Sequence, residues 1–358
     1  MPVGRQHAGV MIDDPLRNAR RTVVAPRRTD PRGVSGPTRG AAHGPSWRKT
    51  SRGLYVPADV DGTNVEQRIA EAAAVLPTVG GITGWAGLRW AGGVWFDGTS
   101  ASGRLRTVDL ATGAADIRSQ PGFHVWQERL GPRELQEADG VRMTDAVRSL
   151  YFAMRYAGSL REAVEYADMA AYSDLCSLDE AIAYALAHPG WTGAPQARDA
   201  LALADENSWS PRETGLRMVW VIDAGLARPL CNRPIFDRLG RHIGTPDLLD
   251  LESGTLGEYD GSVHLERRQR ARDARRDERF RDHGLETFHI FGPDMEDRSH
   301  VARRMHEARA RAKWEPESQR SWTIEPPRWW RPTYTVALRR ALSLDDRATL
   351  LGHRRRVA

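Results

Sequence analysis

The sequence predicts an α+β protein: a mostly helical N-terminal region with short strands, followed by an α/β domain built around a mixed sheet. Between residues 177 and 204, Ala and Leu recur at helical spacing, which is typical of a packed helical bundle. Between residues 206 and 313, hairpin-like strands are followed by a helix, another strand and a final helix. This order indicates a mixed sheet with helices on both faces.

The first 205 residues divide into a tail and a folded region. Residues 1–45 are rich in Arg, Pro, Gly and Thr and lack hydrophobic periodicity, so we expect a disordered basic tail there. Residues 46–205 should fold. The predicted elements are a β-hairpin over 47–60, a helix from Asn64 to Pro77, a short helix over 83–91, short strands over 94–130, and helices over 144–156, 159–171, 177–187 and 194–204. Ser177 and Glu180 predict a capping box at the start of the third of these last helices.

The second folded region covers residues 206–313. Its predicted elements are a helix over 211–225, strands over 229–236, 243–250 and 255–260, a helix over 265–283, a strand over 285–291 and a helix over 294–313. After Trp314 the Pro and Trp residues of EPPRWWRP predict an irregular strap. Residues 314–358 should therefore form a Pro/Trp-rich strap with a short helix near 334–351 and a basic C-terminal tail.

The formal charge of +5 is unevenly distributed. Residues 1–56 hold eleven Arg or Lys against three Asp, and residues 331–358 hold seven Arg against two Asp. The residues between them therefore carry a net charge of about −8, so the body is acidic and both ends are basic. Basic ends of this kind either lie on phosphate backbones or simply solubilise the chain. Nearly all the basic residues are arginine, with Lys49 and Lys313 as the only lysines, which indicates GC-rich coding.

Two classes of protein are excluded by simple counts. Cys176 and Cys231 stand alone, without the Cys or His spacing of a structural zinc site. No apolar run approaches the roughly 20 residues that a membrane helix needs, and the N-terminus lacks a secretory core. We therefore expect a cytoplasmic protein without a membrane partner.

Separated carboxylates give the C-terminal region its chemistry. Glu213 lies in SWSPRETGLR, Asp247 follows a short β-like run in IGTPDLLDLES, and Glu258 and Asp260 end the next run in LGEYDGSVH. Carboxylates at strand ends supply the hard oxygen ligands that Mg²⁺ prefers, and two or three suffice because the ion keeps several waters. The order predicts a divalent-metal site at one end of a sheet.

The same stretch resembles the Vsr-like branch of the PD-(D/E)xK nucleases. The family pattern is S-x-S-x-x-E-x-x-x-R, a strand ending in D, then E-Y/F-D-G-x-x-H and D-x-x-R-D-x-x-L-x-x-x-G. The matching residues here are Ser208, Ser210, Glu213, Arg217, Asp247, Glu258, Tyr259, Asp260, Gly261, His264, Asp273, Arg276, Asp277 and Gly284, with Phe280 at the place of the usual leucine. The match is fairly specific because it needs four separated blocks in order.

The resemblance implies a restriction-endonuclease-like fold that hydrolyses DNA phosphodiester bonds with Mg²⁺ or Mn²⁺. The residues it carries over are Asp247, Glu258, Asp260 and His264 as catalytic residues, Glu213, Asp247 and Glu258 as metal ligands, and Arg275, Arg276 and Arg279 as contacts to the nucleic acid. Asp260 stands where the wider superfamily usually places lysine. An aspartate there binds metal or acts as a base, but it cannot stabilise developing negative charge as lysine does.

Most of these residues also have an ordinary structural explanation, and Asp247 can be a loop cap after Pro246. Glu213 is a suitable capping-box partner for Ser210 at a helix start. Arg276 on the following helix can pair with Glu258 without any metal, and His264 can be a packing or capping residue. The arginine-rich helix around residues 265–283 can be a solvated face with i,i+4 ion pairs.

Upstream, a weaker resemblance covers the N-terminal region. RGLYVPADV, ITGWAGLRWAGG and DGVRMTDAVRSLYFAMRYAGSL look like the AbiEi-type antitoxin family of transcriptional regulators, in which RGLYVP is the wing of a winged-helix module. The helices that should precede the wing are missing, so we expect residues 46–130 to show little sequence-specific affinity for DNA. The leading interpretation is a metal-dependent DNA endonuclease. The alternative is a non-catalytic AbiEi-like regulator or antitoxin that uses the nuclease fold to bind DNA or a partner toxin.

Overall fold

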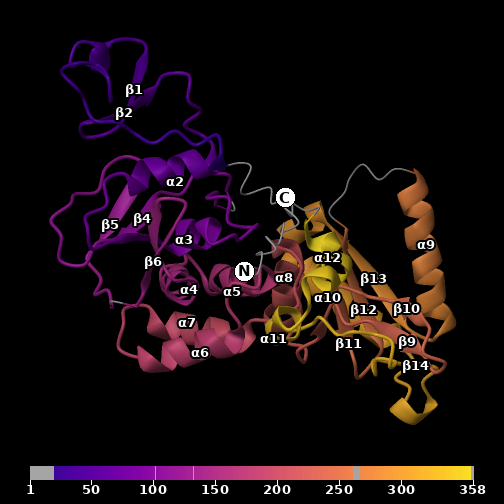
Figure 1. The fold of residues 1–358 in the computed structure, drawn as a ribbon. Helices are drawn as coiled ribbons and strands as arrows, with labels where there is room; N and C mark the ends of the chain where they lie inside the picture. The colour runs from indigo at the N-terminus through magenta and orange to yellow at the C-terminus, as the bar shows by residue number, and fades with distance from the viewer. Residues whose placement is uncertain (1–19, 101, 132, 261–266, 356–358) are drawn as a thin grey trace, which may run out of the picture. The chain divides into compact units, whose positions relative to one another are not determined.

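The computed structural model describes residues 20–355 except 101, 132 and 261–266. These residues form an α+β protein, as the sequence predicts, with several mixed sheets of which none is closed (Figure 1). The chain divides into two compact units. Unit 1 holds the residues up to Gly92 together with Phe96–Asp145, and unit 2 holds Gly93–Trp95 and the residues from Ala146 onward.

Unit 1 is built on a five-stranded mixed sheet with strand order β5-β4-β3-β7-β6. Its strands are β3 (Gly81–Thr83), β4 (Val108–Ala111), β5 (Phe123–Trp126), β6 (Leu135–Ala138) and β7 (Val141–Thr144). Helices α2 (Val65–Ala73) and α3 (Gly84–Trp90) contact this sheet. The predicted hairpin is present as β1 (Trp47–Ser51) and β2 (Leu54–Pro57).

Residues 20–45 are folded, so the prediction of a disordered tail is wrong for this part of residues 1–45. The backbone of Arg27 exchanges hydrogen bonds of 2.8 and 2.9 Å with Tyr55 of β2. The side-chain amide of Gln67 bonds both the N–H and the carbonyl of Val24, at 2.8 and 2.9 Å. Partners elsewhere in unit 1 thus satisfy the backbone of a segment that has no hydrophobic pattern of its own.

Unit 2 begins with four helices that match the predicted ones: α4 (Ala146–Arg155), α5 (Leu160–Tyr172), α6 (Leu178–Ala187) and α7 (Ala194–Leu203). At the start of α6, the Ser177 hydroxyl accepts from the Glu180 N–H at 3.1 Å, and the Glu180 carboxylate accepts from the Ser177 N–H at 2.7 Å. The predicted capping box is confirmed. It satisfies two backbone donors at the helix terminus.

The C-terminal part of unit 2 contains a four-stranded mixed sheet with order β13-β12-β11-β8. Its strands are β8 (Leu230–Cys231), β11 (Leu248–Asp250), β12 (Thr255–Asp260) and β13 (Glu286–Phe291), and β12 and β13 run parallel. A second sheet, with order β10-β9-β14, consists of β9 (Ile235–Asp237), β10 (His242–Gly244) and β14 (Trp322–Thr323). The predicted strands over 229–236 and 243–250 are therefore each divided between two sheets.

Helices cover both faces of the four-stranded sheet, as Figure 1 shows. Leu248 packs with α8 (Pro211–Met218), the following turn and α10 (Arg298–Arg311). Its neighbour Leu249 packs with Phe280 of α9 (Arg267–Asp282) on the opposite face. Neighbouring residues of a strand point to opposite faces of the sheet, which explains this alternation. Helix α9 lies beside β10 and β13.

The boundary between the units lies at Asp145, earlier in the chain than the predicted boundary at residue 205. Within unit 2, Arg217 of α8 and Asp168 of α5 form an ion pair whose side chains are both fully buried. Asp168 also accepts a hydrogen bond of 2.7 Å from the Thr214 hydroxyl. These contacts connect the helices α4 to α7 with the C-terminal part of the same unit.

The C-terminal arginines pair inside unit 2 and do not form the predicted basic tail, as far as Arg354. Arg339 of α11 (Val336–Arg340) is fully buried and donates to Asp174 at 2.6 Å. Arg347 of α12 (Leu344–Leu350) donates to the same carboxylate at 2.7 Å. None of the helices in the described parts of the chain is long and apolar enough to span a membrane.

Candidate metal centre

Glu213, Asp247 and Glu258 come from three elements of unit 2 and lie close together. Asp247 directly precedes β11, Glu258 lies within β12, and Glu213 lies in the first turn of α8. Because β11 and β12 are neighbouring antiparallel strands, Asp247 lies beside Glu258. The Tyr259 N–H donates to Asp247 Oδ2 at 2.7 Å and fixes this arrangement.

The environment of these carboxylates opposes their ionisation. Burial and the nearby Asp247 carboxylate raise the pKa of Glu213 to about 8. Burial raises the pKa of Asp247 to about 6, although the Tyr259 N–H and the Arg276 charge favour its ionised form. Burial and the Asp247 charge also raise the pKa of Glu258 well above its usual value. These shifts favour the protonated form of the carboxyls, and a nearby cation would favour the ionised form.

Glu213 lies next to Asp247 and makes the N-cap half of the predicted capping box, while its carboxylate bonds the Trp209 N–H and the Ser210 hydroxyl. The Ser210 hydroxyl accepts from the Glu213 N–H at 3.2 Å and donates to its Oε1 at 3.0 Å. Its Oε2 accepts from the Trp209 N–H at 2.8 Å. The Glu213 carboxylate thus takes part in the contacts at the helix start and also lies next to Asp247. A metal ion bound to it would compete with those contacts.

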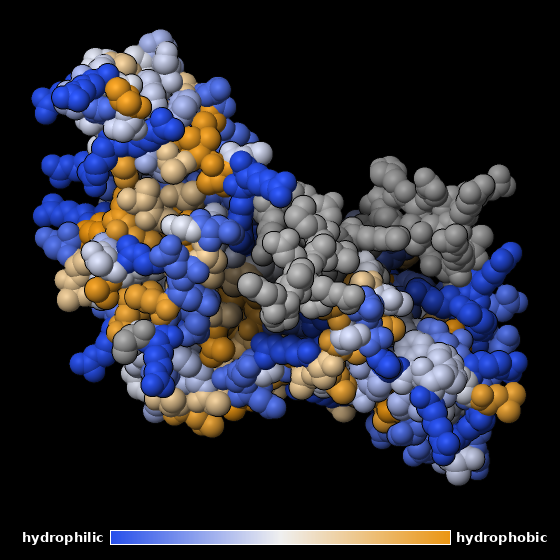
Figure 2. All heavy atoms as spheres, in the orientation of Figure 1, coloured by the Kyte–Doolittle hydropathy of each residue, from blue (hydrophilic) through white to orange (hydrophobic). Residues whose placement is uncertain are grey.

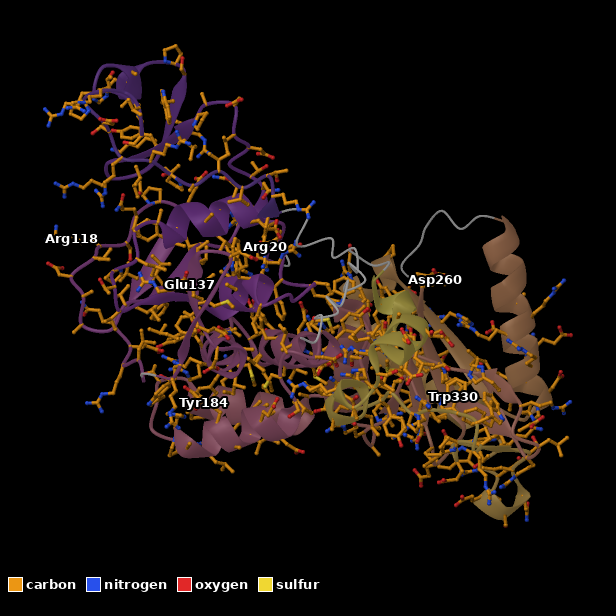
Figure 3. All side chains as sticks on the ribbon, viewed as in Figure 1. Arg20, Arg118, Glu137, Tyr184, Asp260 and Trp330 are labelled. Atoms are coloured by element: carbon orange, nitrogen blue, oxygen red, sulfur yellow. The ribbon has the colours of Figure 1, made fainter. Side chains whose placement is uncertain are left out.

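Of the two remaining predicted catalytic residues, Asp260 is described by the structure and His264 is not. Asp260 lies at the end of β12 (Figure 3), and the two-residue period of the strand puts it on the same face as Glu258. His264 lies outside the described residues. Asp260 is therefore a candidate neighbour of the cluster, and the role predicted for His264 stays a prediction.

The three arginines predicted to contact nucleic acid occupy two different environments on α9. Arg276 donates to Glu258 Oε2 at 3.0 Å, as in the metal-free alternative. Arg275 and Arg279 are exposed on the described part of α9, whose surface is largely hydrophilic in Figure 2. Arg275 and Arg279 are thus more exposed than Arg276, whose side chain is 30% exposed.

His289 is a site residue that the sequence interpretation missed. It lies in β13 directly opposite Glu258 in the parallel register, so both side chains occupy the same face. Its Nε2 is 2.9 Å from Asp277 Oδ2, and its charge, when protonated, lowers the pKa of Asp247. The run TFHIF alternates polar and apolar residues as a half-buried strand does, which places His289 on the polar face, but only the strand register brings it to Glu258.

A divalent ion fits part of this donor set. No three or more His, Cys, Asp or Glu side chains are arranged as a ligand group among the residues that the structure describes. Glu258 Oε1 and Asp277 Oδ1 are nevertheless buried without a hydrogen-bond partner among the described side chains. A buried carboxylate oxygen without a partner is costly unless a cation accompanies it. Asp247 and Glu258 thus offer two hard ligands, enough for an ion that keeps its waters.

Comparisons with known proteins do not identify this chain. No protein-family model matches it, and neither the curated proteins nor the solved structures contain a match.

The raised pKa values predict an unusual pH dependence of stability. The folded pKa values of Glu213 (about 8) and Asp247 (about 6) lie above their ordinary values, so the folded protein retains protons that the unfolded chain releases. In metal-free buffer the melting temperature should fall as the pH rises from about 5 to about 8. Thermal unfolding across this range would test it, with Glu213→Gln as a control that should flatten the curve. A melting temperature that rises through this window would contradict it.

Proposed function

We propose that this protein is a metal-dependent DNA endonuclease whose site is formed by Asp247, Glu258 and Glu213. The observation that supports this most strongly is the gathering of three carboxylates with raised pKa values beside an arginine-rich helix. Such clusters are costly to a fold and are common at functional sites. The resemblance to Vsr-like nucleases in the same residues adds to the proposal.

In the proposed reaction Asp247 and Glu258 hold Mg²⁺ or Mn²⁺. The bound ion would neutralise the negative charge that develops on the phosphate during hydrolysis. The exposed guanidinium groups of Arg275 and Arg279 would bind the DNA backbone and set its position. His289, held at Nε2 by Asp277, would accept or release a proton at its other ring nitrogen. Asp260 would serve as a further ligand or base from the end of β12.

One observation favours a second function, a regulator that uses the fold for binding alone. The ion pair between Arg276 and Glu258 provides a positive partner for that carboxylate without any metal. A protein of this kind would bind DNA or a partner toxin and would leave phosphodiester bonds intact.

A plasmid-nicking assay on the full-length chain separates the two functions. We expect Mg²⁺ or Mn²⁺ to support nicking of supercoiled DNA, and calorimetry to show binding of the ion. An Arg275→Ala/Arg279→Ala variant should bind DNA more weakly, with a smaller salt dependence, since two phosphate contacts are lost. Its melting temperature should stay unchanged, because both side chains are exposed. If the wild-type protein binds DNA but neither binds the ion nor nicks the plasmid, the regulator is the better account.

A further inference from the structure

Asn232 occupies a strained position next to the carboxylate cluster. It follows β8, only 3% of it is exposed, and its backbone adopts a left-handed conformation with φ of 43°. Most residues with a side chain avoid this region, which asparagine tolerates better than others. Strained backbone of this kind persists only where the surroundings impose it, and it occurs often at functional sites.

The side chain of Asn232 uses both of its amide protons. Its Nδ2 donates to the carbonyl of Asn207 at 2.8 Å and to Glu213 Oε2 at 2.6 Å. Both partners are acceptors, so the nitrogen must face them. The rotation of the amide is thereby fixed toward the glutamate.

Asn207 in turn donates hydrogen bonds to the backbone at Asn232, so the two asparagines bond each other in both directions. Its own Nδ2 donates to the carbonyls of Cys231 and Asn232 at 2.7 and 3.0 Å. Its Oδ1 accepts from the Trp209 indole at 3.1 Å and from Arg354 at 3.4 Å. Asn207 is 4% exposed, so these bonds form in an environment from which water is largely excluded.

The backbone of Asn232 also bonds the backbone of Asp247. Its N–H donates to the carbonyl of Asp247 at 3.1 Å, while its side chain holds Glu213. One residue thus connects the start of α8 to the start of β11, the two places from which these carboxylates project.

We propose that Asn232 is a positioning residue that holds the Glu213 carboxylate beside Asp247, and so sets the charge next to the cation that Asp247 and Glu258 would hold. The role in metal binding that this inference gives to Asn232 rests on the proposed metal-dependent function. Its geometric part, the fixed orientation of Glu213, does not. The two parts are tested separately.

The geometric part is tested by exchanging donor and acceptor in metal-free protein. Asn232→Asp replaces the donor by a carboxylate oxygen facing Glu213 and Asn207, so the melting temperature should fall. Adding Glu213→Gln supplies a donor from the opposite side, and the double variant should recover at least half of that loss. If the losses of the two single variants simply add in the double variant, the side chains do not act on one another and the proposal is overturned.

The functional part is tested by titrating Mn²⁺ into the full-length protein. Asn232→Gly keeps the left-handed backbone, since glycine adopts it freely, and removes only the side-chain contacts. We expect its Mn²⁺ affinity to fall by about tenfold or more, as for other residues that orient metal ligands. The control is Asp139→Gly, a change at another left-handed residue (φ 49°) in unit 1, which should bind Mn²⁺ as the wild type does.

The outcomes distinguish the two hypotheses. Wild-type affinity in Asn232→Gly overturns the positioning role while leaving the nuclease proposal intact. If the wild-type protein itself binds no Mn²⁺, the nuclease proposal fails, and with it the purpose assigned to Asn232. The donor–acceptor exchange then still decides whether Asn232 orients Glu213.

Discussion

Replacement of Arg217 by methionine should lower the free energy of unfolding of unit 2 by about 3–5 kcal/mol. The guanidinium of Arg217 bonds Asp168, and both side chains are fully buried. Removing the cation leaves Asp168 with only the Thr214 hydroxyl and the Asp205 N–H, both at 2.7 Å. A buried carboxylate without its counter-ion is among the costliest defects a core can contain.

Urea denaturation of the two variants Arg217→Met and Arg161→Met would measure this effect. Arg161 also pairs with an aspartate across unit 2, Asp223, but these side chains are 22% and 27% exposed. An exposed ion pair is worth less than about 1 kcal/mol, so the control should lose little stability. Equal losses of unfolding free energy in the two variants would contradict this prediction. The buried pair would then contribute no more to stability than the exposed pair.

The elements that local sequence determines could be predicted well. The bundle helices follow from the spacing of Ala and Leu, and the α6 capping box follows from Ser177 and Glu180 alone. The runs beside Asp247 and Glu258 indicated strands near both residues, but the structure places Asp247 just before β11 and Glu258 within β12. In each case the signal lies within a few residues of the feature.

The rest depended on contacts between distant residues. Within unit 2, Arg217 pairs with Asp168, which is 49 residues away, and no local pattern marks such a pair. Arg339 reads as part of a basic tail, yet Asp174 lies 165 residues before it and neutralises it. His289 joins the site only through the register of two parallel strands. Such pairings are set by tertiary packing and override local composition.

Asp247→Asn should reduce metal-dependent cleavage by at least about 10²-fold, because the substitution removes the charge of one of two hard metal ligands. The asparagine oxygen can still accept the Tyr259 N–H, so the local backbone should persist. The melting temperature at pH 8 should stay unchanged or rise in metal-free buffer. The reason is that the Asp247 charge opposes ionisation of both Glu213 and Glu258.

Arg276→Met should have the opposite effect on stability and thus provides the matched comparison. Glu258 would lose the cation that bonds it among the described residues, and its Oε1 has no partner among them either, so the metal-free melting temperature should fall. Mn²⁺ should restore much of this loss if Glu258 is a ligand, because the ion would replace the guanidinium as its counter-charge. Thermal melts of both variants with and without Mn²⁺ measure this. The opposite result would be a lower melting temperature for Asp247→Asn and no effect of Mn²⁺ on the melting temperature of Arg276→Met. It would show that the carboxylates stabilise the fold and do not bind metal.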